Sequence, residues 1–194
     1  MKRLILASAL TLALASPAFA QTAATDTQRD VNQQERIENG LKDGQLSTGE
    51  AARLEKGEAR IDQTEAKDMK DGTLSPAEKA QIQKEQNAES RRITKDDNNA
   101  IKGDPNSASS KRMQADVQRD ANQEKRINNG VKNGTLTNKE AGRLENGQAR
   151  TDRKEYRAGK DGHVGRNEQR HIQRGENHQS HKVWRKKHNE QDRK

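Results

Sequence analysis

The 194-residue chain contains no cysteine, and it is poor in aromatic and other large apolar side chains. The lack of cysteine excludes disulfides, zinc–thiolate sites and cysteine nucleophiles. After residue 20 only 22 residues are Leu, Ile, Val, Met, Phe, Tyr or Trp, which predicts a marginal hydrophobic core. Nothing in the chain resembles a nucleophile elbow, a P-loop, a dinucleotide-binding loop or a His-Glu-x-x-His motif. We therefore expect a protein that is not an enzyme.

Residues 1–20 have the pattern of a secretory signal peptide. Two basic residues precede a short apolar stretch that ends in small residues at positions 16, 18 and 20. The stretch is short for an uncleaved membrane anchor, and no second apolar span follows it. We therefore expect cleavage after Ala20, no transmembrane segment in the mature chain, and a periplasmic or secreted location. A short disordered segment over residues 21–26 is expected to follow.

A short phrase occurs four times and is expected to join two helices each time. It places Asp-Gly or Asn-Gly a few residues before a Glu, over residues 42–50, 70–78, 132–140 and 160–168. The Asp-Gly or Asn-Gly pair favours a turn, because its glycine can adopt a positive φ. In the first three phrases a Ser or Thr with Glu three residues later forms a capping box, which starts the next helix. We call each phrase a joint.

Shifted by 90 residues, the chain matches itself without a gap; Leu54-Glu55, for example, matches Leu144-Glu145. Within each copy the joint returns after 28 residues, which predicts three helices per copy. The predicted helices cover residues 27–41, 48–68 and 76–94, and then 116–131, 138–158 and 167–188. Val31, Ile37, Leu54, Ile61 and Ile82 mark their narrow apolar stripes.

We therefore expect an all-α fold of two tandem three-helix units with marginal cores. The first helical repeat is expected over residues 27–94 and the second over residues 116–188. Residues 95–115 hold Asp-Asp-Asn-Asn, Gly103-Asp104-Pro105 and Ser-Ala-Ser-Ser, which predicts a flexible linker between the units. Residues 189–194 form a short tail.

The two copies differ in charge. Residues 21–110 carry 14 Lys and Arg against 18 Asp and Glu, whereas residues 111–194 carry 22 against 12. A basic segment favours an anionic partner such as nucleic acid, acidic polysaccharide or lipid headgroups. We therefore predict an exported binding or structural protein whose basic copy contacts an anionic polymer or the envelope surface; the plain alternative is a solvated helix end. The candidate contact residues are Arg166, Arg170, Arg174, Lys182, Arg185, Lys186 and Lys187.

An alternative function is the binding of Zn²⁺, Cu²⁺ or Ni²⁺ in the periplasm. All five histidines lie in the second half of the chain, and imidazole suits these ions. On one continuous helix His178 and His181 are close enough to share an ion, and His171 and His188 lie on the same exposed arc. The neighbouring Lys and Arg side chains oppose a cation, so weak binding is expected.

The joint also resembles the exit half of an EF-hand loop. With Gly at loop position six, Asp43 and Asp71 stand at position five, and Glu50 and Glu78 at position twelve. The resemblance implies calcium binding by these four residues. The first half of the loop does not match, and a capping box explains the same Glu residues without a metal. Calcium is therefore the least favoured of the three ligands, and no other cofactor is expected.

Overall fold

The computed structural model describes residues 18–189, and these form only helices and the connections between them. The helices are α1 (Ala18–Lys42), α2 (Thr48–Asp68), α3 (Pro76–Asp97), α4 (Ala108–Lys132), α5 (Asn138–Gly159) and α6 (Arg166–Lys187), with one 3-10 turn, η1 (Met69–Asp71). The all-α prediction is confirmed. Among the described helices none combines the length and the apolar character that a membrane crossing requires. Residues 1–17 of the predicted signal peptide and residues 190–194 of the predicted tail lie outside the described residues.

The joints form as predicted. Capping boxes start α2, α3 and α5 at Ser47, Ser75 and Thr137, each with the Glu three residues later. The glycines of the four turns adopt φ between 71° and 97°. Residues other than glycine rarely occupy this region. As a result, four of the six helices (α2, α3, α5 and α6) begin within one residue of the predicted start, whereas α1 and α4 begin nine and eight residues before it.

Replacing Ser75 is expected to weaken α3. The Glu78 backbone N–H donates to Ser75 Oγ at 3.3 Å, and the Ser75 N–H donates to Glu78 Oε2 at 2.7 Å. Ser75→Ala removes the first of these bonds and should lower the free energy of unfolding by about 1 kcal/mol, measured by urea denaturation. Ser75→Asp, which restores an acceptor at the cap, is the control. Equal losses in both variants would contradict the capping role.

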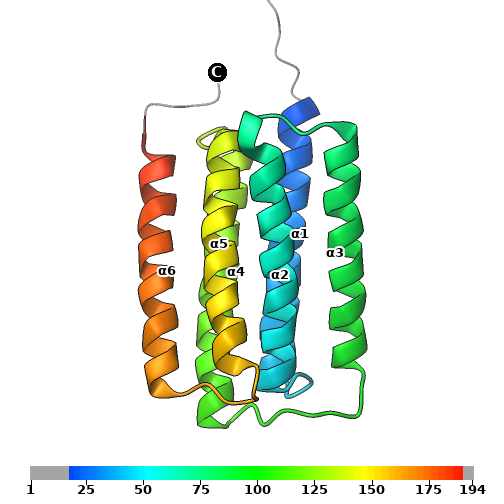
Figure 1. The fold of residues 1–194 in the computed structure, drawn as a ribbon, viewed down its shortest axis with the longest axis vertical. Coiled ribbons are helices and arrows are strands. Elements are labelled where there is room, and N and C mark those ends of the chain that lie inside the picture. Colours follow the sequence, from blue (N-terminus) through cyan, green and yellow to red (C-terminus); the bar gives the residue numbers. More distant parts are fainter. Residues whose placement is uncertain (1–17, 190–194) are drawn as a thin grey trace, which may run out of the picture.

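The six helices form an antiparallel bundle (Figure 1). α1, α2, α4 and α5 form its centre, and α3 and α6 flank it on opposite sides. α2 packs most extensively on α5, and α1 packs on α4. Each of these pairs joins one helix of the first copy to the equivalent helix of the second copy.

The apolar side chains gather into two clusters, one near each end of the bundle, and both copies contribute to each. One cluster includes Leu41 and Leu46 with Met113 and Val164. The other includes Met69 with Ile127, Leu136 and Val183. The expected arrangement of two units with their own cores is therefore not the one observed. With so few large apolar side chains, neither copy can bury the inner faces of its helices alone, and pairing the copies covers them.

The connection between the copies is shorter than the linker expected over residues 95–115. α3 continues through Asp97 and α4 begins at Ala108. The Gly103 N–H donates to the Gly44 carbonyl oxygen at 2.9 Å, and Asn99 Nδ2 donates to Glu50 Oε1 at 2.7 Å. The connection thus packs on the first joint, because its polar groups complete the hydrogen bonding of that turn.

Candidate metal centre

Between the two apolar clusters, carboxylates line the interior of the bundle. Besides the capping residues Glu50 and Glu140, fourteen Asp and Glu side chains are at most 3% exposed, and no Lys, Arg or His is buried among the described residues. We call these fourteen the interior carboxylates. They are Asp26, Asp30, Glu55, Glu58, Asp62, Glu65, Glu89, Asp116, Asp120, Glu124, Glu145, Asp152, Glu155 and Glu176.

Helical spacing brings these side chains to the inner faces. In α2 the acids stand at residues 55, 58, 62 and 65, and in α5 the polar residues at 145, 148, 152 and 155 repeat the pattern. Steps of three and four residues keep a side chain on one face of a helix. That face of α2 meets the same face of α5, so the two rows oppose each other in the interior.

The 90-residue repeat preserves this polar interior. The fourteen acids occupy nine pairs of equivalent positions. Five pairs are acidic in both copies, and in the other four pairs a glutamine replaces the acid in one copy. The four glutamines are Gln34, Gln86, Gln148 and Gln179, and all are buried.

Three groups of interior carboxylates bring ligand atoms within 4.8 Å of one another. The first group is Glu55, Asp120 and Asp152; the second group is Asp62, Glu124 and Glu145; the third group is Asp120, Glu155 and Glu176. Two oxygens bound on opposite sides of one Ca²⁺ ion are separated by twice the bond length, about 4.6–5.2 Å. Each group is therefore compact enough for its members to share one ion.

The flanking helices reach the interior through two glycines of the central helices. A Cβ on Gly57 would overlap the carboxylate of Glu89 from α3, and a Cβ on Gly147 would overlap the amide of Gln179 from α6. Gln179 Nε2 donates to the Leu144 carbonyl oxygen at 2.7 Å. These glycines thus let a polar side chain of each outer helix enter the bundle.

Substitution of Gly57 should be costly despite the better helix propensity of alanine. Gly57→Ala is expected to displace Glu89 and α3 and to lower the free energy of unfolding by about 1–3 kcal/mol, measured in urea at pH 6. Gly175→Ala is the control, because its Cβ meets only the flexible end of Lys154. That variant should gain about 0.5–1 kcal/mol. A gain in both variants would show that the Glu89 position is not tightly held.

Most of the oxygen atoms of the interior carboxylates have no hydrogen-bond donor. Among the described residues only Glu89 and Glu176 pair with a basic side chain, Arg92 at 2.7 Å and Arg119 at 3.0 Å. Some have no amide, hydroxyl or basic donor on either carboxylate oxygen and lack such a pair as well; among these are Glu58, Glu145, Asp152 and Glu155. An isolated buried charge costs several kcal/mol or more, so the interior requires protons or cations.

Where a glutamine replaces an acid, its amide can donate hydrogen bonds to the neighbouring carboxylates. Gln86 Nε2 donates to Asp30 Oδ1 at 2.7 Å and to Glu65 Oε1 at 3.2 Å. Its equivalent in the second copy is Glu176, which belongs to the third group. An amide donor therefore lies in the first copy where the second copy has a carboxylate.

Burial raises the pKa values of the interior carboxyls toward or beyond neutrality. It raises the pKa of Asp116 to about 7, that of Glu55 to about 8 and that of Glu176 to about 9. The nearby charge of Asp120 is the second cause of the upward pKa shift in each of these three groups, after burial. Near pH 7 these groups hold protons unless a cation replaces them.

The donor set is suited to hard cations. Carboxylate and amide oxygens favour Mg²⁺, Ca²⁺ and Mn²⁺, whereas imidazole and thiolate favour Zn²⁺ and Cu²⁺. All three groups consist of carboxylates alone. Side chains on facing helices are also how other helical bundles build metal sites.

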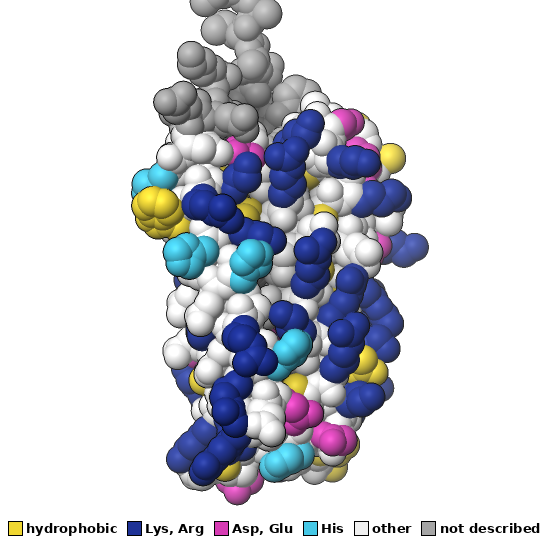
Figure 2. All heavy atoms as spheres, turned by 60° about the vertical axis from the view of Figure 1, so that its left-hand side comes forward, with side chains coloured by type: hydrophobic (Ala, Val, Ile, Leu, Met, Phe, Trp, Pro, Cys, Tyr) yellow, Lys and Arg dark blue, Asp and Glu magenta, His cyan; other side chains and the backbone are white. Residues whose placement is uncertain are grey.

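The basic residues predicted to contact an anionic partner lie on the outside of α6. Arg166, Arg170, Arg174 and Arg185 are exposed. Lys182, Lys186 and Lys187 are half-buried, and Lys186 Nζ lies 3.4 Å from Glu140 Oε1. Figure 2 shows Lys and Arg side chains spread over this face of the molecule with few acids between them.

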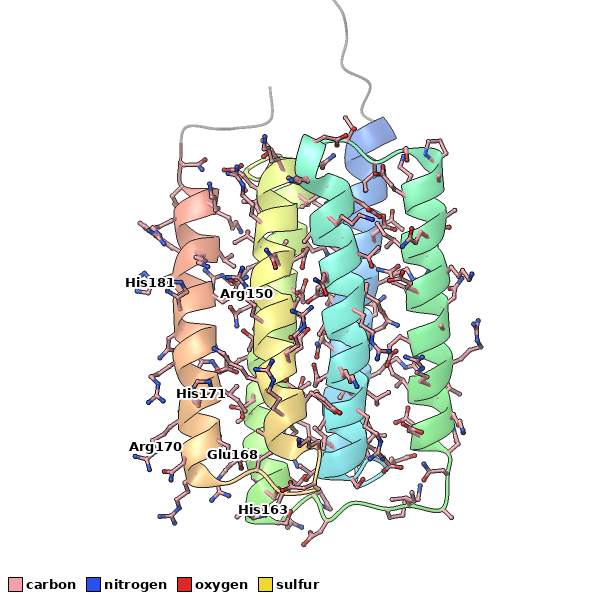
Figure 3. All side chains as sticks on the ribbon, viewed as in Figure 1. Arg150, His163, Glu168, Arg170, His171 and His181 are labelled. Carbon is pink, nitrogen blue, oxygen red and sulfur yellow. The ribbon has the colours of Figure 1, made fainter. Side chains whose placement is uncertain are left out.

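The histidines predicted to bind a transition metal are also on the outside. His171, His178, His181 and His188 are exposed, as their helical arc predicts, and Figure 3 shows His181 projecting from α6 away from the bundle. His188 stacks on Trp184, with ring centroids 4.6 Å apart. No histidine joins the three groups of the described residues, so binding by His178 and His181 stays a prediction.

The residues implied by the EF-hand resemblance lie at the joints, outside the interior. Glu50 and Glu78 close the capping boxes of α2 and α3. Asp71 accepts hydrogen bonds from the Thr73 backbone and side chain at 2.9 and 3.0 Å, and these bonds lower its pKa. Asp43 is exposed. Calcium binding at the joints also stays a prediction.

The interior carboxylates were missed by sequence reasoning, although a signal was present. Acids at steps of three and four residues recur in both copies, beside the apolar stripe at Leu54-Glu55 and Leu144-Glu145. No protein-family model, no curated protein and no solved structure matches this chain, so its own residues carry every functional inference.

Proposed function

We propose that the protein binds hard metal cations inside its helical bundle, through the three groups of interior carboxylates. The observation that carries this proposal is the presence of fourteen buried acids with no buried basic residue among the described residues. Ions held by oxygen ligands would neutralise these charges and would occupy positions that no hydrogen-bond donor fills. With the predicted signal peptide, this makes the protein a non-enzymatic cation-binding protein of the periplasm or the extracellular space.

The proposal is tested by equilibrium dialysis of residues 21–194, freed of metal with a chelator, against Ca²⁺, Mn²⁺, La³⁺ and Zn²⁺ at pH 7.5. Asp62→Asn/Asp120→Asn changes a ligand in every group, because Asp120 belongs to two of them. His178→Ala/His181→Ala removes the predicted histidine pair, and Asp43→Asn/Asp71→Asn removes acids from the joints without touching the capping glutamates.

Loss of Ca²⁺, Mn²⁺ and La³⁺ binding in Asp62→Asn/Asp120→Asn alone is the expected result. Loss confined to the histidine variant, with Zn²⁺ as the ion bound, would instead support the transition-metal alternative. Loss in the joint variant would support the calcium loop. Full binding in all three variants, or no binding by the unaltered chain, would contradict the interior site.

A second candidate function, contact with an anionic polymer or surface, is favoured by the exterior charge. Because fourteen of the 30 acids are interior carboxylates, 38 Lys and Arg residues are opposed by only 16 acids elsewhere in the chain. Seven of the interior carboxylates belong to the first copy, so its surface is not the acidic one that its sequence suggests. The exposed Trp184 adds a stacking surface on α6.

Heparin chromatography of the whole chain in a salt gradient tests this candidate, since polyanion binding weakens steeply with salt. Arg170→Gln/Arg174→Gln/Arg185→Gln removes three exposed charges from α6. The control, Lys84→Gln/Arg91→Gln/Lys95→Gln, removes the same charge from exposed positions on α3. Earlier elution of the α6 variant alone supports contact through α6; equal elution of both variants would mean that total charge alone sets retention.

We also propose that duplication of a 90-residue unit produced the bundle. Equivalent contacts support it: Arg36 donates to Ser90 Oγ at 2.8 Å, and Arg126 donates to Ser180 Oγ at 2.7 Å. A duplicated unit with polar inner faces places identical acids opposite one another when two copies pack together. This explains why the carboxylates gather at the centre of the bundle.

A further inference from the structure

The first and second groups of interior carboxylates are related by the repeat. A shift of 90 residues carries Glu55 and Asp152 of the first group onto Glu145 and Asp62 of the second. The third member of the first group, Asp120, is equivalent to Asp30. The third member of the second group, Glu124, is equivalent to Gln34. Each group therefore implies a fourth ligand in the other.

Asp30 lies near the second group, outside the three carboxylates whose oxygens are within 4.8 Å of one another, and its Oδ2 has no hydrogen-bond partner. It is buried at 1% exposure, and it is near enough to Asp62 and Glu145 for its charge to act on both carboxyls. Three carboxylates of this set come from α1, α2 and α5, and Glu124 comes from α4. All four central helices thus contribute one acid.

Gln34 takes the equivalent place beside the first group. Its Nε2 donates to Glu55 Oε2 at 3.0 Å, whereas its Oε1 has no hydrogen-bond partner although the side chain is 3% exposed. Rotation of the Gln34 amide by 180° about χ3 would exchange the positions of Nε2 and Oε1. Oε1 would then face the first group as an oxygen ligand. The unpartnered oxygen is what a cation in this group would use.

Resting on the proposed function, we infer that the bundle holds two cation sites of one design that differ by a single charge. The three-charge site consists of Glu55, Asp120, Asp152 and Gln34. The four-charge site consists of Glu145, Asp30, Asp62 and Glu124. The sole difference between them in ligand chemistry is the pair Gln34 and Glu124.

The extra carboxylate makes the four-charge site the tighter of the two. Ligand charge is one of the two main factors that set calcium affinity in proteins, together with rigidity. A further unit charge a few Å from the ion, in a partly polar interior, is worth about tenfold or more in affinity. The difference should be larger for La³⁺ than for Ca²⁺, because the attraction scales with the charge of the ion.

The two sites are adjacent. Asp62 of the four-charge site and Asp152 of the three-charge site face each other, close enough for one carboxyl to donate a hydrogen bond to the other. Ions in the two sites therefore repel each other, and this repulsion widens the separation between the first and second binding steps.

Exchanging the two residues tests the inference. Calorimetric titration of the metal-free whole chain with Ca²⁺ and with La³⁺ should show two steps that differ about tenfold or more in affinity. Glu124→Gln should lower the affinity of the first step by a similar factor, and Gln34→Glu should raise that of the second. The double exchange Gln34→Glu/Glu124→Gln keeps the total charge and should restore the original pair of affinities.

Gln33→Glu is the control, since Gln33 is equally buried but donates to the Gln86 carbonyl oxygen at 2.9 Å. A rise in affinity equal to that of Gln34→Glu would show that any added interior charge suffices, and it would overturn the assignment. A single step in the unaltered chain, or an unchanged first step in Glu124→Gln, would also overturn it while leaving cation binding in place. If neither ion binds to the unaltered chain, the proposed function itself fails. Circular dichroism of each variant verifies that it is folded.

Discussion

Raising the pH is expected to destabilise the metal-free protein, in the direction opposite to ordinary acid denaturation. Burial raises the pKa of Asp30 to about 7, that of Glu55 to about 8 and that of Glu176 to about 9. In the unfolded chain each of these groups titrates near its ordinary value of about 4. The stability that each contributes is fully present below that pH, and it is lost as the pH rises through the pKa of the folded state.

The loss should be a large fraction of the total stability. Each unit of pKa difference corresponds to about 1.4 kcal/mol, several groups contribute, and domains of this size are stable by about 5–15 kcal/mol. Thermal unfolding followed by circular dichroism from pH 5 to pH 9, in the presence of a chelator, should show a melting temperature that falls throughout. A flat or rising melting temperature would contradict the carboxylate interior.

Cations should reverse this trend. At pH 8 the interior carboxylates lose their protons readily and become free to bind Ca²⁺ or La³⁺. A ligand at a hundred times its dissociation constant stabilises the folded state by about 2.7 kcal/mol per site. The same scan with 1 mM La³⁺, about a hundredfold excess for a site with a dissociation constant of about 10 μM, should therefore restore a high melting temperature above pH 7.

A single amide substitution is expected to have opposite effects on stability and on binding. No amide, hydroxyl or basic group donates a hydrogen bond to either carboxylate oxygen of Asp152. Burial, and then the charges of Asp62 and Asp120, raise its pKa well above the ordinary value. Asp152→Asn removes a charge that the metal-free protein must otherwise neutralise. At pH 8 without metal, the free energy of unfolding should rise by roughly 1–4 kcal/mol.

The same variant should bind cations at least about tenfold more weakly at the first group, since even indirect changes around metal ligands cost that much. Melting temperatures with and without La³⁺ measure both effects in one experiment. Glu35→Gln is the control, because it removes a half-buried acid paired with Lys125 at 2.7 Å, and its effect should stay within about 1 kcal/mol. Destabilisation by Asp152→Asn in both conditions would mean that the carboxylate has a structural role instead.

The helices could be predicted from the sequence, because their ends are encoded locally. The Ser75 and Thr137 caps, with their glutamates three residues later, depend on neighbours in the chain alone. The exposure of His178 and His181 followed from helical periodicity in the same way. These features depend on local sequence and not on how the helices pack.

The packing of the two copies and the polar interior could not be predicted, because both depend on residues far apart in the chain. Glu55 and Asp62 in an isolated α2 read as a solvated face. That face is buried because α2 packs against α5, which carries Glu145 and Asp152 at the equivalent positions. The scarcity of large apolar residues predicts a marginal core, whereas many of the buried side chains are polar or charged.

The two apolar clusters have a kinetic consequence. They fill the two ends of the bundle over residues 18–189, so we expect an ion to enter the interior from the side, between helices. On one side that path passes the groove between α2 and α3, where Glu89 lies over Gly57. Exchange must then wait for an outer helix to move aside, a collective motion of microseconds to milliseconds or slower. We therefore expect ions at the proposed sites to have long residence times. Slow exchange would suit a protein that carries or sequesters ions, whereas a fast buffer would present its ligands at the surface.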